Sequence, residues 1–156
     1  MRPVLQVRTC GESTTTRRFW GLPSDVSEAR DARPTFDERG LPPNTPFNAD
    51  EEVTPRELRD RLAAGEDIHL IDCRLPAERA ITAIEPSELV PLQMLSAYYD
   101  DAVAPHRDET VVVYCRMGGR SLEFARFLKA KGFKNAKSLA GGINLWNADF
   151  GGGPIY

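Results

Sequence analysis

The sequence predicts an α/β domain with a mainly parallel central sheet flanked by helices. Segments with the composition of short strands alternate along the chain with segments that have the apolar spacing of helices. The most apolar segment, residues 111–114, is a continuous run of β-branched and aromatic residues, as expected of a parallel strand buried on both faces. With 156 residues, the chain is long enough for one such domain and too short for two.

The first helix is predicted from its end signals. Thr54 supplies an N-cap, Pro55 occupies the first helical position, and Glu57 stands three residues after the cap, which is the pattern of a capping box. Gly65 is placed to end the helix, because glycine readily adopts the left-handed conformation found just beyond helix ends.

Two strands and a helical stretch follow. Residues 68–72 predict a short strand, and residues 89–92 predict a second, brief one. The spacing of apolar residues then indicates a helical stretch through residues 94–98.

The second half of the domain repeats the alternation. After the strand at 111–114, apolar residues at helical spacing indicate a helix from about Ser121 that stops at Gly132. Residues 137–139 predict the last strand, and the glycine pair 141–142 opens a short final helix.

The N-terminal third of the chain has a different character. Residues 1–50 are rich in proline, threonine, arginine and aspartate, and residues 41–46 have the composition of an extended connector. We therefore expect an irregular, proline-rich N-terminal extension over residues 1–50 and the α/β domain over residues 51–156.

Composition and charge exclude several classes of protein. An apolar content of 41% is enough to build a core, so the chain is not disordered throughout. The net charge of −3 argues against nucleic acid as a partner. No apolar run approaches the roughly 20 residues that span a bilayer, and no hydrophobic stretch follows the N-terminus as in a secretory signal. We expect no membrane association.

The cysteines and histidines bear on the compartment and on metals. Cys10, Cys73 and Cys115 are odd in number and lack paired spacing, which suits a reducing, cytoplasmic setting with at least one free thiol. His69 and His106 stand apart in the sequence, and the chain has no C-x-x-C motif. We therefore expect no metal site.

Cys115 is the candidate nucleophile. It ends a core strand and precedes a glycine-containing loop and a helix that starts near Ser121. Such a loop can aim successive backbone N–H groups at the Cys115 sulfur, and the helix adds the positive end of its dipole. Both effects favour the thiolate, which is the nucleophilic form.

The loop residues support this interpretation. Gly118 and Gly119 permit the tight curvature that residues with a Cβ resist, and Arg116 and Arg120 add positive charge that would lower the thiol pKa and attract an anionic donor. The alternative is that Cys115 is an inert, buried apolar residue, as most cysteines are; the loop and its charges argue against it.

The other two cysteines lack such a setting. Cys10 lies in the polar extension. Cys73 follows a buried strand, where packing is the expected role, although its position at a strand end leaves a resolving role open.

Four stretches in register resemble the rhodanese family. The unit 111–121 resembles the active-site loop, and residues 70–74 resemble the early strand that ends in Asp-x-Arg. Residues 127–133 resemble the helix end after the active loop, and residues 139–146 resemble the closing Gly-Gly-x-x-x-Trp segment. The resemblance covers about residues 53–148 and implies a single rhodanese-like domain.

The resemblance implies a double displacement without a cofactor. Cys115 would take a sulfane sulfur from thiosulfate or from a partner's persulfide, and a thiophilic acceptor would then remove it. Asp72 and Arg74 would support the site, although a surface ion pair is an equal alternative. The loop residues that would bind the substrate and the persulfide are Arg116, Met117, Gly118, Gly119, Arg120 and Ser121.

Two rival functions remain within this family resemblance. Phosphatases that resemble this family have a longer Cys-x5-Arg loop, whereas Cys115 to Arg120 is Cys-x4-Arg, with Ser121 at the place of the phosphatase arginine. A non-catalytic binding module would have no need of the nucleophile, and its presence here argues against that alternative.

The chain differs from the family pattern in one segment and has a further similarity at its C-terminal end. Residues 79–88 lack the Gly-His that the family carries, so we expect a rearranged backbone between the first two strands. The ending 153–156 is similar to the Pro-x-Tyr tail of rhodanese domains fused to adenylating domains that load sulfur onto a small carrier protein. A sulfur-carrier protein is therefore a candidate partner.

Overall fold

The computed structural model describes residues 34–156, which form one compact unit. Leu41, which lies in the segment expected to form an irregular extension, is fully buried with Ala140 and Leu145. Cys10 lies outside the described residues. Within the described part of the chain, no helix is long and apolar enough to cross a membrane.

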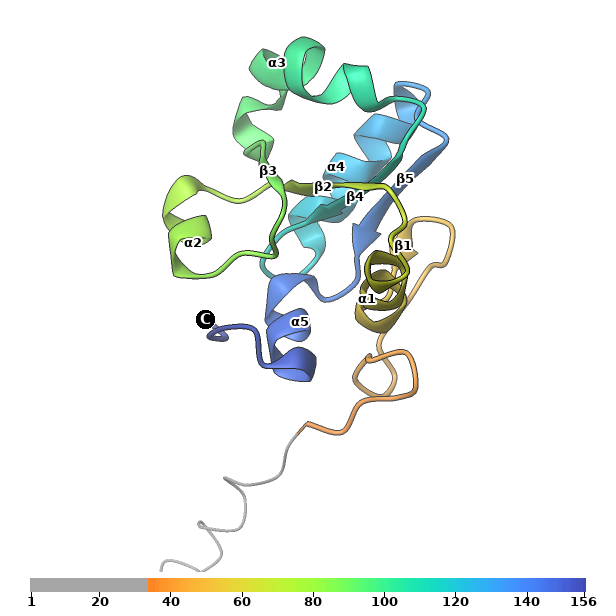
Figure 1. The fold of residues 1–156 in the computed structure, drawn as a ribbon, viewed down its shortest axis with the longest axis vertical. Coiled ribbons are helices and arrows are strands. Elements are labelled where there is room, and N and C mark those ends of the chain that lie inside the picture. The colour runs from red at the N-terminus through yellow and green to blue at the C-terminus, as the bar shows by residue number, and fades with distance from the viewer. Residues whose placement is uncertain (1–33) are drawn as a thin grey trace, which may run out of the picture. The chain divides into compact units, whose positions relative to one another are not determined.

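The centre of the domain is a five-stranded sheet in the order β1-β5-β4-β2-β3, in which every pairing is parallel (Figure 1). This agrees with the fold class predicted from the sequence. The strands are β1 (Glu52–Val53), β2 (Ile68–Asp72), β3 (Glu88–Leu89), β4 (Thr110–Tyr114) and β5 (Asn135–Leu139).

Helices cover both faces of the sheet (Figure 1). The α-helices are α1 (Pro55–Ala63), α2 (Pro76–Ile81), α3 (Leu95–Tyr98), α4 (Gly119–Ala130) and α5 (Gly142–Phe150). Three short helical turns surround α3 and lead into β4: η3 (Leu92–Met94) and η5 (Ala104–His106) are 3₁₀ turns, and η4 (Tyr99–Val103) is a π turn.

The alternation of side chains along β4 divides the core in two. Val111 and Val113 face one way and pack with residues of α3 and α4, including Phe124. Val112 and Tyr114 face the other way and pack with residues of α1 and α5. Because both faces of β4 are covered, the strand is apolar without interruption, as the sequence indicated.

The predicted start and end of the first helix are confirmed. The Thr54 hydroxyl accepts a hydrogen bond from the Glu57 backbone N–H at 3.2 Å, and Gly65 follows the helix with a φ of +78°. The sequence did not reveal β1, which is too short to show a pattern, or α2, which occupies part of the segment 79–88 where the chain departs from the family.

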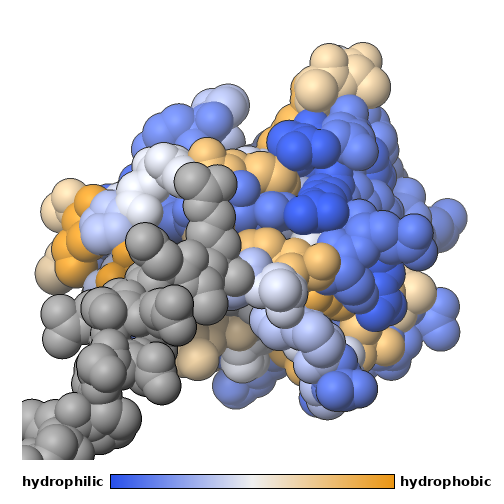
Figure 2. Space-filling model, turned by 90° about the horizontal axis from the view of Figure 1, so that it is seen from below, coloured by the Kyte–Doolittle hydropathy of each residue, from blue (hydrophilic) through white to orange (hydrophobic). Residues whose placement is uncertain are grey.

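The surface of the domain is mainly polar. In the view of Figure 2, hydrophilic residues cover most of the visible described surface, and hydrophobic residues form small separate groups between them. The large apolar side chains that are exposed include Leu75, Met117 and Ile155.

Candidate active site

Cys115 lies directly after β4, between the strand and the loop that leads into α4. The residue is only 1% exposed. Cys73 follows the neighbouring strand β2, and its backbone N–H donates to the Tyr114 carbonyl at 3.0 Å, which extends the β2–β4 pairing to the two cysteines. Both thiols are free and buried.

The loop turns back on the Cys115 sulfur at Gly118. The Gly118 N–H donates to Cys115 Sγ at 3.0 Å, and the Ser121 hydroxyl donates to it at 3.4 Å. Gly118 has a φ of +107°, a conformation that side chains with a Cβ resist, whereas Gly119 already belongs to α4. Of the two glycines, Gly118 is therefore the one that the turn requires.

The start of α5 holds the backbone of the Cys115 loop through two hydrogen bonds. The Ile143 N–H donates to the Cys115 carbonyl at 2.8 Å, and the Asn144 N–H donates to the Arg116 carbonyl at 3.1 Å. A Cβ on Gly142 would lie 2.5 Å from both carbonyl oxygens. The sequence identified this glycine pair as the start of a helix but gave no indication that the helix holds the Cys115 loop.

Hydrogen bonds make Cys115 the acidic member of the cysteine pair. The neighbouring Cys73 thiol has the largest effect, burial opposes it, and the donors on Ser121 and Gly118 add to it, so that the pKa of Cys115 is lowered to about 5. The neighbouring Cys115 sulfur and burial raise the pKa of Cys73 far above its usual value. At neutral pH Cys115 is therefore the thiolate and Cys73 the thiol.

The two arginines of the loop have different surroundings. Arg120 forms a bidentate pair with Glu78 of α2, at 2.8 and 2.7 Å, and this pair lowers the pKa of Glu78 to about 2. Arg116 is exposed, with its guanidinium 5.7 Å from the centre of the Tyr156 ring. Met117, between them in sequence, is 66% exposed.

Asp72 and Arg74 form a buried ion pair, so the alternative of a surface pair is wrong for them. Both side chains are 0% exposed, and the Arg74 guanidinium donates to both Asp72 oxygens at 2.9 and 2.7 Å. Arg74 also donates to the Thr82 carbonyl at 2.7 Å and to the Tyr156 hydroxyl at 2.6 Å. The network joins β2, the segment after α2 and the C-terminal residue.

The structure corrects the expectation that the two histidines are isolated. The His69 and His106 rings stack with their centroids 3.5 Å apart, and Glu88 lies beside them. They meet because β2 and the turn that precedes β4 are neighbours in space, although the residues are far apart in the sequence.

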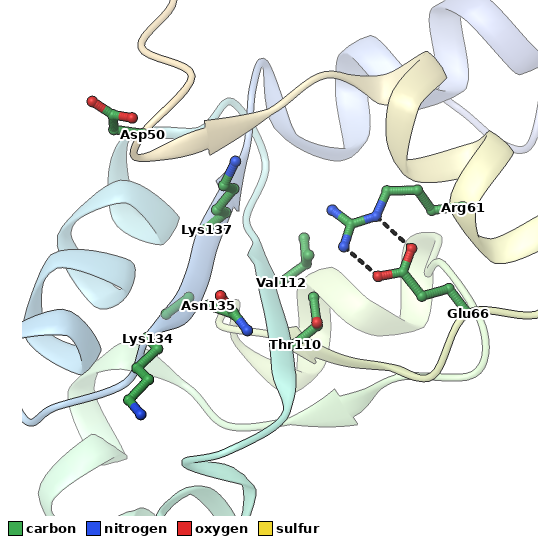
Figure 3. A pocket seen from close by; sticks show the side chains of 9 residues that line it. Asp50, Arg61, Glu66, Thr110, Val112, Lys134, Asn135 and Lys137 are labelled. Atoms are coloured by element: carbon green, nitrogen blue, oxygen red, sulfur yellow. Dashed lines mark hydrogen bonds and ion pairs between the residues drawn. The ribbon is translucent and has the colours of Figure 1, made fainter.

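A separate cavity of about 350 Å³ lies where β4 and β5 begin (Figure 3). Cys115 lies at the other end of β4. Among its described lining residues there is no cysteine. Charged side chains dominate, and the Arg61–Glu66 ion pair closes one side. We assign no role in the chemistry of Cys115 to this cavity.

The chain belongs to the rhodanese-like domain family, whose sequence profile matches residues 54–149. This confirms the resemblance drawn from the four sequence stretches. Membership in this family, together with relatives that are named sulfurtransferases, supports a general role in sulfur transfer.

Three relatives illustrate the range of the family. The chain is 42% identical over 94 residues to the probable adenylyltransferase/sulfurtransferase MoeZ of Mycobacterium tuberculosis, covering 60% of this chain and 24% of MoeZ. It is 34% identical over 95 residues to a sulfurtransferase of Allochromatium vinosum, covering 61% of this chain and 86% of that protein. The human single-domain sulfurtransferase TSTD1 superposes with a TM-score of 0.55 at 25% identity, covering 64% of this chain and 96% of the human one.

The extent of these matches differs. The chain spans about a quarter of the length of the mycobacterial relative and most of the length of the Allochromatium one. The similarity to the longer proteins is therefore confined to one part of them.

Proposed function

We propose that the protein is a sulfurtransferase that carries a sulfane sulfur as a persulfide on Cys115. The observation that carries this proposal is the Cys115 thiolate, with a pKa of about 5, held by the Gly118 N–H and the Ser121 hydroxyl. A thiolate at neutral pH is the form that attacks sulfur.

The reaction balances as two displacements. With thiosulfate as donor, the Cys115 thiolate attacks the outer sulfur, the S–S bond of thiosulfate breaks, and sulfite leaves with the electron pair. An acceptor thiolate or cyanide then attacks the outer sulfur of the persulfide, and Cys115 leaves as the thiolate. The N–H and hydroxyl donors that stabilise the thiolate are placed to stabilise the persulfide anion as well.

Two features favour sulfur transfer over phosphate transfer. Cys115 is 1% exposed, so a slender terminal sulfur reaches it more readily than a tetrahedral phosphate. The Arg120 guanidinium is occupied by Glu78 on both sides of its fork, which leaves it poorly disposed to clamp a phosphate.

We propose that the physiological donor or acceptor is an anionic small molecule, a persulfide-bearing protein, or a small sulfur-carrier protein in the cytoplasm. The similarity to an adenylyltransferase/sulfurtransferase supports the last of these. Three exposed apolar side chains offer contacts to a protein partner: Met117 in the Cys115 loop, Leu75 next to Arg74, and Ile155 next to Tyr156.

The test is to incubate the full chain with thiosulfate and to measure the mass of the Cys115 peptide together with thiocyanate formation from cyanide. We expect an adduct of about 32 Da, one sulfur atom, that cyanide removes. Cys115→Ser should lose both adduct and turnover, whereas Cys73→Ser, the matched change at the neighbouring strand end, should retain them.

Other outcomes would select other functions. Hydrolysis of p-nitrophenyl phosphate that depends on Cys115, without an adduct, would favour the phosphatase. Absence of both adduct and hydrolysis, also with a protein persulfide as donor, would favour a non-catalytic binding module. Turnover with thiosulfate that no carrier protein stimulates would count against the carrier as partner.

A further inference from the structure

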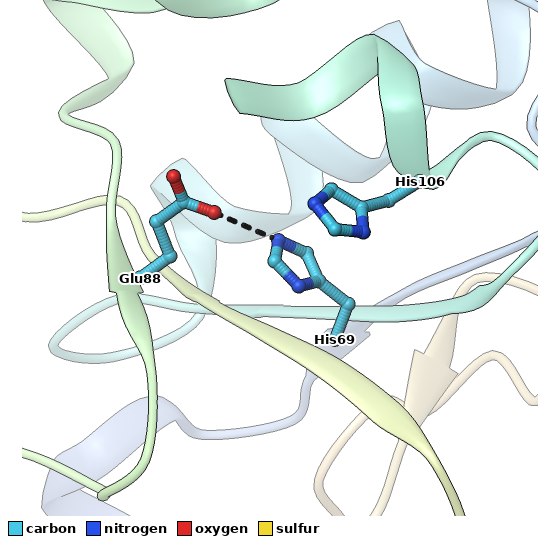
Figure 4. A group of neighbouring side chains, drawn as sticks. All are labelled: His69, Glu88 and His106. Atoms are coloured by element: carbon cyan, nitrogen blue, oxygen red, sulfur yellow. Dashed lines mark ion pairs between the residues drawn. The ribbon is translucent and has the colours of Figure 1, made fainter. Parts of the chain in front are cut away.

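Two histidines and a glutamate from three separate segments meet at one place beside the sheet (Figure 4). His69 comes from β2, Glu88 from β3, and His106 from the 3₁₀ turn η5. One donor atom from each of the three residues lies within 4.8 Å of the others. All three side chains are partly buried.

This cluster is separate from Cys115. His69 pairs with Val111 in the β2–β4 register, and Val111 precedes Cys115 by four positions. At the rise of a strand this separation is roughly 13 Å along the sheet. The sulfur-transfer reaction therefore makes no use of these side chains.

The Nε2 atom of His69 has an unmet bonding requirement. This atom is buried and makes no hydrogen bond, although a Glu88 carboxylate oxygen lies 3.0 Å from it. The Glu88 carboxylate is thus close to His69 Nε2 but does not form a hydrogen bond with it.

A second carboxylate orients His106. Its Nδ1 atom lies 2.8 Å from Glu109, which leaves Nε2 as the atom available for a ligand. A histidine ligand whose other ring nitrogen contacts a carboxylate is the usual arrangement in metal sites, since the carboxylate fixes the ring and increases its basicity.

We propose that His69, Glu88 and His106 bind a transition-metal dication, with Zn²⁺ the best match to the ligands. Two imidazoles and one carboxylate form a three-ligand set that leaves a fourth position for water. Imidazole favours zinc and its neighbours, whereas Mg²⁺ and Ca²⁺ prefer sites made of oxygen.

Binding requires a modest local adjustment. Ligands of one tetrahedral zinc ion lie roughly 3.3 Å apart, closer than the 4.8 Å limit of the present cluster. The stacked rings, inclined by only 9°, must also turn so that their nitrogen lone pairs converge. Rotation about the Cβ–Cγ bond of histidine has broad minima, and η5 is a short turn, so both changes are accessible.

The metal would join three segments that are otherwise weakly connected. β3 is an edge strand of two residues, paired only with β2 among the described strands. A shared ion would link it to β2 and to the turn that enters β4. Since the folded chain would bind the ion and the unfolded chain would not, the ion would stabilise the domain.

The test uses the fact that the whole chain has only two histidines. Zinc sulfate is added to the ¹⁵N-labelled, chelator-treated full chain, and the imidazole signals are followed in long-range proton–nitrogen NMR spectra. We expect both imidazoles to respond and to saturate at one equivalent. His106→Ala should weaken zinc binding at least about 100-fold, and Glu109→Gln by roughly 10-fold.

Matched variants separate this site from the thiols. Asp108→Asn, next to Glu109, should leave zinc affinity unchanged, and Cys115→Ser should keep the imidazole response. Circular dichroism confirms that each variant is folded, and Cys115 alkylation provides a second check for the variants that keep this cysteine. The proposal is wrong if excess zinc leaves both imidazole signals in place, if His106→Ala binds as tightly as the wild type, or if Cys115→Ser abolishes the response.

Discussion

Cys73 and Cys115 stand at the ends of neighbouring parallel strands, yet they are in opposite protonation states. Both are buried, at 0% and 1% exposure. Burial alone would raise both pKa values. Cys115 differs because the chain after β4 turns back and places donors on its sulfur, whereas the chain after β2 runs into the Asp72–Arg74 network.

The donors of the loop therefore distinguish Cys115 from Cys73, since the two strand ends are otherwise alike. The neighbouring Cys73 thiol has the largest effect in lowering the pKa of Cys115.

The largest effect is expected from Gly142→Ala. Its φ is +63°, and the new Cβ would lie 2.5 Å from the carbonyl oxygens of Cys115 and Arg116. To relieve this clash, either α5 or the Cys115 loop must move. We expect persulfide formation to fall about 100-fold or more, since small displacements of a reacting group have effects of that size. The free energy of unfolding should fall by roughly 2–4 kcal/mol.

Gly151→Ala is the matched control. Gly151 has a similar φ of +69°, but a Cβ there would have nothing within 4 Å. The substitution should therefore cost only about 1–2 kcal/mol of backbone strain and leave persulfide formation intact. Equal losses in the two variants would mean that backbone strain alone, and not contact with the loop, explains the effect. Denaturant unfolding and the mass of the Cys115 peptide measure the two quantities.

The next effect is expected from Cys73→Ala, which removes the neighbouring thiol that has the largest influence on the pKa of Cys115. The pKa of Cys115 should rise from about 5 by on the order of one unit. Because the thiolate is the reactive form, alkylation of Cys115 should become slower between pH 5 and 6 and stay nearly unchanged at pH 8. The pH dependence of iodoacetamide labelling, followed on the Cys115 peptide, measures the shift.

Cys73→Ser keeps a donor at the same position and serves as the control. Its labelling curve should stay near that of the wild type. A Cys73→Ala curve that also coincides with the wild type would show that the loop donors alone set the pKa of Cys115, and that the two strand ends are not coupled.

The local parts of this molecule could be predicted from the sequence. The helix that begins at Thr54, the strand at β4 and the Cys115 loop each depend on residues that are adjacent in the chain, and their patterns are visible there. The strand β1 could not be predicted, because its two residues are extended only through their pairing with β5.

The contacts that complete the site are long-range, and a single sequence does not display them. Glu78 and Arg120 are 42 positions apart, so the sequence showed a free cation where the structure has an ion pair. The same holds for the support of the Cys115 carbonyl by Ile143 and for the meeting of His69 with His106. In each case the contact forms because the order of the strands in the sheet brings distant segments together, and no local sequence pattern indicates it.

The smallest effect is expected from Ser121→Ala. The Ser121 hydroxyl lies 3.4 Å from Cys115 Sγ, farther than the Gly118 N–H at 3.0 Å, so its loss should raise the pKa of Cys115 by only about half a unit. Ser138→Ala removes a hydroxyl that lies 2.8 Å from that of Ser121 and makes no hydrogen bond to the sulfur, so it should change the pKa of Cys115 less than Ser121→Ala does. Iodoacetamide labelling against pH measures both variants. A rise as large as that of Cys73→Ala would show that the Ser121 hydroxyl lowers the pKa of Cys115 as much as the neighbouring Cys73 thiol does.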